Sequence, residues 1–118
     1  MKEIRSVPQG RGLLALYLER GKGDACSGLV RAEASGVTFH FSSLAAMAML
    51  TEQLLDLPEE ALPEPGPVPA ENPDFEMEIL FRQNYSWQGR FRPVGESRWE
   101  NFHSVLELLT LLESALTE

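Results

Sequence analysis

The chain has 118 residues, 43% of them hydrophobic, and a formal net charge of −8 at pH 7. This length suits one compact domain, or two small halves that share a core, because two separate domains would each bury too little surface. The acidic balance disfavours general binding to phosphate backbones and anionic membranes, so we expect no double-stranded nucleic acid among the partners.

The first half of the chain predicts three strands followed by a helix. Apolar runs bounded by turn residues predict strands over 13–19 and 27–33, and alternation predicts a third strand over 37–41. Ser42 or Ser43 is placed to cap the helix, which ends before the proline-rich stretch that follows. The expected inner face of this helix consists of Leu44, Met47, Leu50 and Leu54, with Leu57 as a further candidate.

Residues 58–74 form a proline-rich, acidic linker. They contain six of the chain's eight prolines and no basic residue. Because proline lacks a backbone donor and fixes its own φ, this stretch can neither extend a sheet nor propagate a helix. The favoured interpretation is a tether over the surface, and the alternative is a docking peptide for a proline-recognising groove.

The second half begins with an alternating strand. Residues 75–81 place Phe75, Met77, Ile79 and Phe81 on one expected apolar face. A hairpin region, a strand over 89–94 and a short strand over 98–102 then lead to the last helix.

An amphipathic helix with an intact start signal closes the second half. Ser104 and Glu107 have the spacing of a capping box, so the helix is expected to begin near Ser104. Leu106 and Leu111 widen its apolar stripe until only a narrow polar face remains. We expect so wide a stripe to need two partners, namely a sheet and either a second helix or a second copy of the protein. The rest of the stripe is Val105, Leu108, Leu109, Leu112, Ala115 and Leu116.

The two halves repeat each other in sequence. At an offset of 61, residues 28–55 align with 89–116 without a gap, and seven of the 28 pairs are identical. The identical pairs are Gly28/Gly89, Arg31/Arg92, Phe41/Phe102, Ser43/Ser104, Leu50/Leu111, Glu52/Glu113 and Leu55/Leu116. We therefore predict an α+β fold of two βββα repeats with pseudo-twofold symmetry, whose antiparallel strands are covered by two helices. The single domain, 1–118, would consist of repeat 1 (12–57), the linker (58–74) and repeat 2 (75–117).

Basic, amide and aromatic residues alternate over 82–92. Regular strand geometry places Arg90 and Arg92 on one face and Trp87 on the other. The favoured interpretation is structural, with the tryptophan in the core and the arginines paired across strands with Glu76, Glu78 or Glu96. The alternative is a recognition face for a carboxylate, a phosphate or a single-stranded base. Its contact residues would be Arg82, Asn84, Trp87, Arg90 and Arg92.

Two motifs follow one another in the second half. Arg82-Gln-Asn with Ser86-Trp-Gln-Gly89 precedes Phe102-His-Ser-Val-Leu-Glu-Leu108, which is followed by Leu112-Glu-Ser-Ala-Leu116. Over residues 75–117 the chain thereby resembles a group of small bacterial proteins of unknown function. The first half departs from that pattern in its hairpin, and the resemblance implies no activity.

The sequence contains no clear catalytic or metal-binding pattern. His40 and His103 are interpreted as surface or helix-end side chains, since no Cys or His spacing typical of a metal site occurs. Cys26, the single cysteine, cannot form an internal disulfide and agrees with a cytoplasmic location. No stretch approaches the roughly 18 apolar residues of a membrane helix. We therefore expect no cofactor, no metal and no membrane partner.

These observations favour a non-enzymatic interaction or regulatory module, in which a homodimer or another protein partner buries the wide stripe of the last helix. The alternative is binding of a small ligand or single-stranded RNA through the Arg82–Arg92 hairpin. An enzyme of unrecognised type is the third hypothesis, and it is disfavoured because no acid, base and nucleophile cluster in the sequence.

Overall fold

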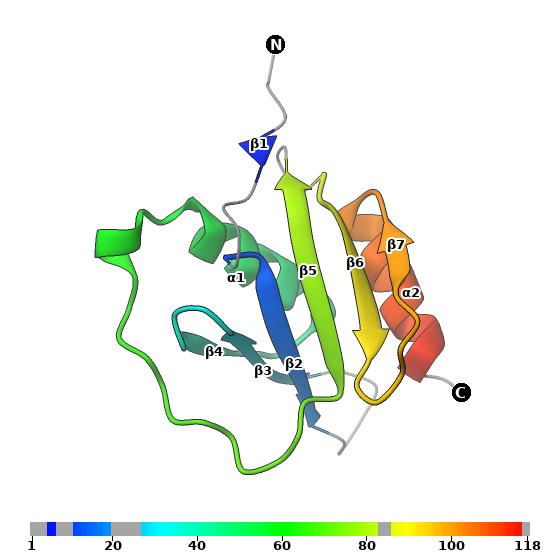
Figure 1. Ribbon diagram of the computed structural model, residues 1–118, viewed down its shortest axis with the longest axis horizontal. Coiled ribbons are helices and arrows are strands. Elements are labelled where there is room, and N and C mark those ends of the chain that lie inside the picture. The colour runs from blue at the N-terminus through cyan, green and yellow to red at the C-terminus, as the bar shows by residue number, and fades with distance from the viewer. Residues whose placement is uncertain (1–4, 7–10, 20–26, 83–85, 117–118) are drawn as a thin grey trace.

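The computed structural model describes residues 5–6, 11–19, 27–82 and 86–116 (Figure 1). The strands are β1 (Arg5–Ser6), β2 (Leu13–Glu19), β3 (Ser27–Ala32), β4 (Thr38–Phe41), β5 (Phe75–Arg82), β6 (Gln88–Pro93) and β7 (Glu100–Phe102). The helices are α1 (Leu44–Asp56) and α2 (Val105–Leu116), and a short 3₁₀ turn, η1 (Glu59–Ala61), follows α1. The predicted strands and helices are confirmed to within a few residues at their ends.

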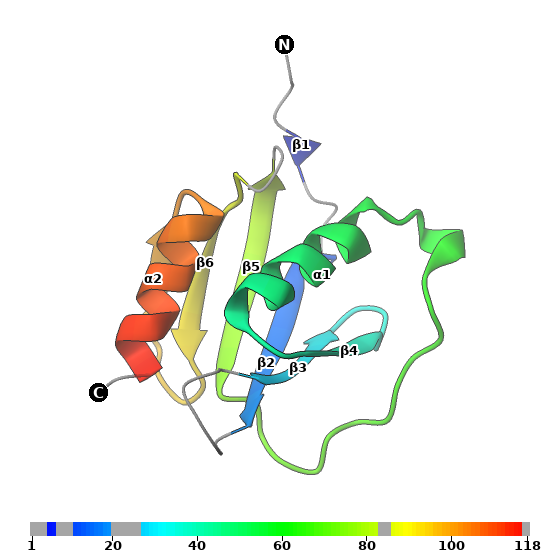
Figure 2. The ribbon, with the colours of Figure 1, turned by 180° about the vertical axis from the view of Figure 1, so that it is seen from behind.

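The described strands form one antiparallel sheet in the order β4-β3-β2-β5-β6-β7, and β1 pairs with the far end of β5. The central pair, β2 with β5, joins the first half of the chain to the second. Both helices lie on the same face of this sheet, behind it in Figure 1 and in front of it in Figure 2. The fold is therefore α+β, as predicted, with one sheet face covered by helices.

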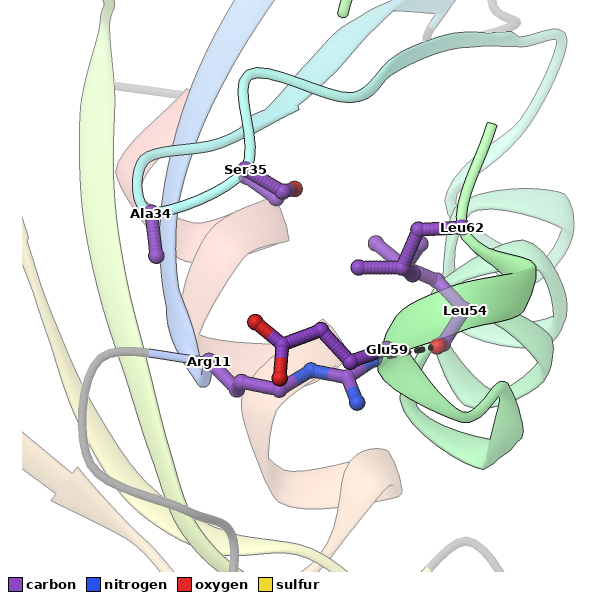
Figure 3. A pocket seen from close by; sticks show the side chains of 7 residues that line it. Arg11, Ala34, Ser35, Leu54, Glu59 and Leu62 are labelled. Atoms are coloured by element: carbon purple, nitrogen blue, oxygen red, sulfur yellow. Dashed lines mark hydrogen bonds between the residues drawn. The ribbon is translucent and has the colours of Figure 1, made fainter. Parts of the chain in front are cut away.

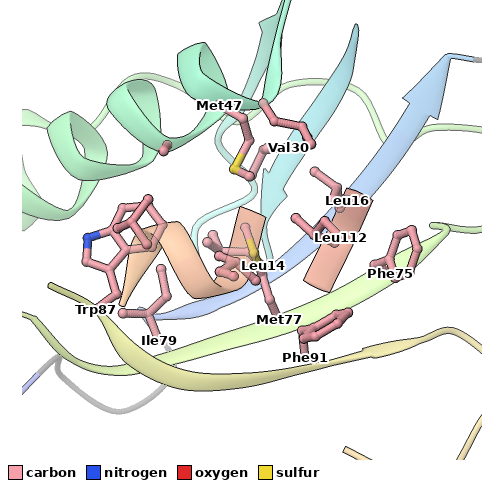
Figure 4. Packing of buried hydrophobic residues seen from close by; sticks show 14 of the residues in the cluster. Leu14, Leu16, Val30, Met47, Phe75, Met77, Ile79, Trp87, Phe91 and Leu112 are labelled. Carbon is pink, nitrogen blue, oxygen red and sulfur yellow. The ribbon is translucent and has the colours of Figure 1, made fainter. Parts of the chain in front are cut away.

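The core fills the layer between the helices and the inner face of the sheet. Alternate residues of β2 and β5 point into this layer and meet side chains from both helices. Figure 4 shows Leu14, Met77 and Leu112, from β2, β5 and α2, in the middle of the cluster. Trp87 is fully buried at one end of the layer. Because residues of both halves interdigitate, neither half has a separate core.

Gly28 in β3 and Gly89 in β6 each lie opposite a phenylalanine of the next strand. Gly28 pairs with Phe41, and Gly89 pairs with Phe102. A Cβ atom on Gly28 would collide with the carbonyl oxygen of Tyr17, and one on Gly89 would meet a carbonyl of β5 in the same way. Glycine at these two positions therefore lets the strands approach their neighbours.

Serine side chains start both helices. Ser43 Oγ accepts a hydrogen bond from the backbone N–H of Ala46 at 3.0 Å, and Ser104 Oγ accepts one from that of Glu107 at 3.0 Å. The Glu107 carboxylate in turn accepts from the N–H of His103 at 2.9 Å. The predicted cap of the last helix is confirmed, although the carboxylate reaches one residue further back than in the usual capping box.

The end of β5 departs from the predicted alternation. The pairing of β5 with β6 shifts register between Ile79 and Phe81. Since a one-residue shift exchanges the two faces of a strand, Phe81 is 43% exposed and Arg82 is buried. The prediction that Phe81 belongs to the apolar face is therefore wrong, and Arg82 points inward instead.

The linker lies against the turn between β3 and β4. The N–H of Gly66 donates to the carbonyl of Gly36 at 3.0 Å, and the Arg31 guanidinium donates to both glycine carbonyls at 3.2 Å. Apart from η1 the linker has no helix or strand, in agreement with its prolines. It follows the edge of the sheet from α1 round to β5 (Figure 1).

Candidate functional site

The residues of the predicted recognition face are divided between the two faces of the sheet. Arg82 and Trp87 are buried on the helix side. Arg90 and Arg92 lie on the opposite face, in positions directly across from Glu78 and Glu76 of β5. Asn84 lies outside the described residues. The described residues of the predicted face therefore form two pairs on opposite faces of the sheet: Arg82 with Trp87, and Arg90 with Arg92.

The inner pair meets a buried carboxylate of α1. Arg82 contacts Glu52 Oε1 at 3.2 Å, and the indole N–H of Trp87 donates to Glu52 Oε2 at 2.6 Å. Arg82 also donates to the carbonyl of Leu55 at 2.8 Å and contacts Asp56 Oδ1 at 2.7 Å. Both oxygens of the buried carboxylate therefore have partners, as a buried charge requires.

This cluster of Glu52, Arg82 and Trp87 fastens α1 to β5 and β6. Its members hydrogen-bond to one another and to the backbone of α1, which is typical of a structural cluster. The signal in the sequence is the position of Glu52, one helical turn after Ala48 and therefore on the face that packs against the sheet. A carboxylate on such a face predicts a buried cation, although it does not say which one.

The outer pair surrounds a tryptophan. Arg90 pairs with Glu78 at 3.0 Å, and Arg92 pairs with Glu76 at 3.3 Å. Both guanidinium groups also lie over the ring of Trp99, at 4.4 and 4.3 Å from its centroid. Since each guanidinium already faces a carboxylate and an aromatic ring, this face carries little net charge with which to attract an anion.

The end of α1 forms a second polar feature, which is half-buried. The last turn of α1 contains no basic residue, and Arg11 supplies a cation by donating to the carbonyls of Leu54 and Leu57 at 3.0 and 2.9 Å. This guanidinium lines a small pocket with Ser35 and Glu59 (Figure 3). The pocket volume of about 90 Å³ has room for a few water molecules and is too small for a cofactor.

An apolar groove separates the N-terminal halves of the two helices. Leu106 on α2 is 74% exposed and Met49 on α1 is 53% exposed, whereas Leu108 and Leu112 are fully buried. The wide stripe of α2 is therefore divided: its centre lies in the core and Leu106 lies at this groove, whereas Leu111 is half-buried and lines a separate hollow beside Phe91. The groove is lined by Ala45, Ala48, Met49, Ser86, Ser104, Val105, Leu106 and Leu109.

Residues with possible acid, base or metal chemistry are dispersed. Among the described residues, no three His, Cys, Asp or Glu side chains form a group that could hold a metal ion. His40 is exposed, His103 lies 3.3 Å from Glu107, and Cys26 is outside the described ranges. Burial raises the pKa of Tyr17 above its ordinary value of 10.0, as does the charge of Glu33, and the nearby Arg31 opposes this effect. The Tyr17 phenol therefore stays protonated near neutral pH.

No helix in the described part of the chain has the length and apolar character that crossing a bilayer requires. No protein-family model, curated protein or solved structure matches the sequence. Within the described residues, the groove between α1 and α2 is a surface site lined mainly by apolar side chains.

Proposed function

We propose that this protein is a non-enzymatic interaction or regulatory module that binds a protein partner through the groove between α1 and α2. The observation that carries the proposal is Leu106, a leucine with three quarters of its surface in water beside an apolar groove. Grouped apolar side chains on an otherwise polar surface mark sites of association. Met49 on the facing helix adds a flexible side chain that can adapt to a partner. The single cysteine supports a cytoplasmic location for this module.

Binding of a small ligand or single-stranded RNA through the Arg82–Arg92 hairpin is less well supported. Stacking of bases needs accessible aromatic rings beside free cations. Trp87 is fully buried, and Arg82 is engaged with Glu52 and the end of α1. The geometry therefore favours the helix groove over the hairpin as the functional surface.

We also propose that the two halves are copies of one βββα unit related by pseudo-twofold symmetry. Each half supplies three strands and a helix in the same order, and β2 and β5, the first strands of the two predicted repeats, pair at the centre of the sheet. The equivalent pairs Gly28 with Phe41 and Gly89 with Phe102 support this proposal, as do the serine caps of both helices. Duplication of one unit accounts for the strand order, in which the third, second and first strands of repeat 1 are followed by the first, second and third strands of repeat 2.

Site-specific photo-cross-linking in living cells tests the interaction proposal. A benzophenone amino acid replaces Leu106, and the matched control carries it in place of Asn101, which is exposed on β7. Asn101 pairs with Arg90 and so lies on the opposite face of the sheet. We expect illumination to attach a protein to position 106, giving a species heavier than the 13.2 kDa chain. Absence of any adduct at 106, or equal adducts at both positions, contradicts the proposal.

A further inference from the structure

We infer that residues 63–69 of the linker form a strap that closes one edge of the sheet, the free side of β4, to the addition of another strand. This inference goes beyond the proposed function, because it concerns the sheet edge and not the groove between the helices. Three observations carry it, namely the outward-facing backbone of β4, the lack of other protection on this strand, and the contacts that hold the linker beside it.

β4 directs part of its backbone away from the sheet. It stands at one end of the strand order, next to β3. The carbonyl of Val37 accepts from the N–H of Ala32 at 2.8 Å, so the backbone of Val37 faces β3. Because the direction alternates along an antiparallel strand, the backbone groups of Thr38 and His40 point away from β3. Such outward-facing groups are a template for pairing with another chain.

The sequence of β4 contains none of the usual protections of an edge strand. Natural edges are commonly blunted by charged side chains, by proline or by a bulge. β4 reads Thr-Phe-His-Phe and pairs with β3 in an uninterrupted register. The opposite edge strand, β7, is only three residues long and begins with Glu100. Protection of β4 therefore depends on cover from another part of the chain.

The linker supplies such a cover at Gly66. The N–H of Gly66 donates to the carbonyl of Gly36 at 3.0 Å, at the turn that leads into β4. Arg31 Nη1 donates to the carbonyls of both glycines at 3.2 Å and so holds the linker to the turn. A Cβ atom at position 66 would collide with Thr38 Oγ1, so the linker backbone lies directly against the first residue of β4. Both ribbon views show the linker running outside the β4 end of the sheet (Figures 1 and 2).

An added strand would need the space that Gly66 fills. Paired strands lie about 4.8 Å apart, so a new strand would have to pass close beside Thr38. With that end of β4 covered, His40 is the one outward-facing residue of the strand that stays accessible. Strands usually need three or more residues. The strap therefore leaves too short an edge for strand addition.

The strap is attached locally and can open without unfolding the sheet. Gly66 is half-buried, whereas residues 63–65, 67 and 68 on either side of it are exposed. Segments with few buried contacts open at low free energy compared with the core. A seat at one glycine, clamped by one arginine, therefore determines whether the β4 edge is closed or open.

Two variants are designed to open the strap. Gly66→Pro removes the N–H that donates to Gly36, and Arg31→Met removes the clamping guanidinium. The control for the first is Val68→Pro, which also creates a run of three prolines but lies at a side chain that is 73% exposed. The control for the second is Arg90→Met, because Arg90 is likewise a half-buried arginine on the outer face of the sheet.

Two measurements follow the strap and the edge separately. Nuclear Overhauser contacts between residue 66 and the Thr38 methyl group show whether the strap is seated. Size-exclusion chromatography with light scattering, from about 1 µM to about 500 µM, shows whether open edges pair with one another. We expect Gly66→Pro and Arg31→Met to lose the contacts and to reach about 1.5 times the wild-type average mass or more at the highest concentration. Both controls should match the wild type.

A further substitution locates the association at β4. His40→Pro removes an N–H that points away from β3, so it leaves the pairing within the sheet intact. Added to Gly66→Pro, it should return the mass to that of the wild type. Association that persists in this double variant overturns the inference, as does a wild-type mass in Gly66→Pro and Arg31→Met after the contacts are lost. Contacts retained in both variants, or equal association of Val68→Pro, would show that the seat at Gly66 does not hold the strap and overturn it too.

Discussion

Arg82 links the end of β5 to three residues of α1 through one guanidinium group. It neutralises the buried carboxylate of Glu52, contacts Asp56, and satisfies the carbonyl of Leu55 near the end of α1. Arginine suits this place better than lysine, because its planar fork can reach several acceptors at once. Removing one partner of a buried ion pair leaves the other charge without compensation and destabilises the fold, so the stability of this region depends on both Arg82 and Glu52.

Substitution Arg82→Met is expected to destabilise the protein by about 3–5 kcal/mol, because the buried side chain of Glu52 loses its cationic partner. The measurement is urea unfolding followed by circular dichroism.

The control is Arg90→Met. This removes a similar ion pair, to Glu78, but the Arg90 side chain is 42% exposed, so the expected cost is within about 1 kcal/mol. Equal losses from both variants would show that the buried cluster contributes no more than a surface pair.

The place of Arg82 could not be predicted from the alternation of β5. Phe75, Met77 and Ile79 follow the expected period and are buried. The register shift after Ile79 then turns Phe81 outward and Arg82 inward. A bulge of this kind depends on pairing with β6 and leaves no local signal in the sequence, whereas the pairing of Arg90 and Arg92 with β5 glutamates follows from simple alternation.

At the scale of the element, the last carbonyls of α1 accept hydrogen bonds from residues that are distant in the sequence. Its start is local, since Ser43 is its neighbour in sequence. Its last carbonyls have no nearby cation and instead accept from Arg11 and Arg82, which lie before β2 and at the end of β5. Cations at this end also oppose the partial negative charge of the helix dipole.

Removal of the Arg11 guanidinium by Arg11→Ala is expected to loosen the last turn of α1. Two charge-assisted hydrogen bonds are lost, each worth about 1.5–3 kcal/mol when desolvated and less where water can replace them. Amide hydrogen exchange near Leu54–Leu57, observed by NMR, should accelerate by about tenfold or more, which corresponds to about 1.4 kcal/mol.

Arg98→Ala serves as the comparison, because it removes the same charge from an exposed side chain in the segment between β6 and β7. Exchange in α1 should be unchanged in that variant. Similar acceleration in both would attribute the effect to overall charge instead of to the helix end.

The starts and ends of the elements were predictable because their signals are local. Serine caps, the proline after α1 and the alternation of β2 each act within a few residues. The order of strands across the sheet is not encoded in this way, and neither is the placement of both helices on one face. Those features depend on contacts between segments far apart in sequence, as does the capping of α1 by Arg11.

At the scale of the whole molecule, the two halves share one sheet and one core. The β2–β5 pair runs through the centre, with Leu14 opposite Met77 and Leu16 opposite Phe75. Each half alone would therefore expose an unpaired strand edge and an apolar layer with only part of its cover. The linker joins α1 to β5 and contributes no strand to the sheet.

Separate fragments, 1–66 and 67–118, are expected to show no cooperative unfolding when studied singly, and to recover the native circular dichroism spectrum when mixed. The cut falls in the linker, so it removes no pair of the central strands. Cooperative unfolding of one fragment by itself would show that a half contains a sufficient core, which conflicts with the packing described above.

The central β2–β5 pair also has a consequence for synthesis on the ribosome. β2 is made early, but β5 leaves the exit tunnel about 60 residues later, which takes on the order of 3–12 s at typical translation rates. During that interval the nascent first half has an open strand edge and a half-covered apolar face. The acidic, proline-rich linker emerges in the same interval, and such a segment resists β-pairing with other chains. We therefore expect the linker to limit pairing of the exposed strand edge with other chains until the second half has been made.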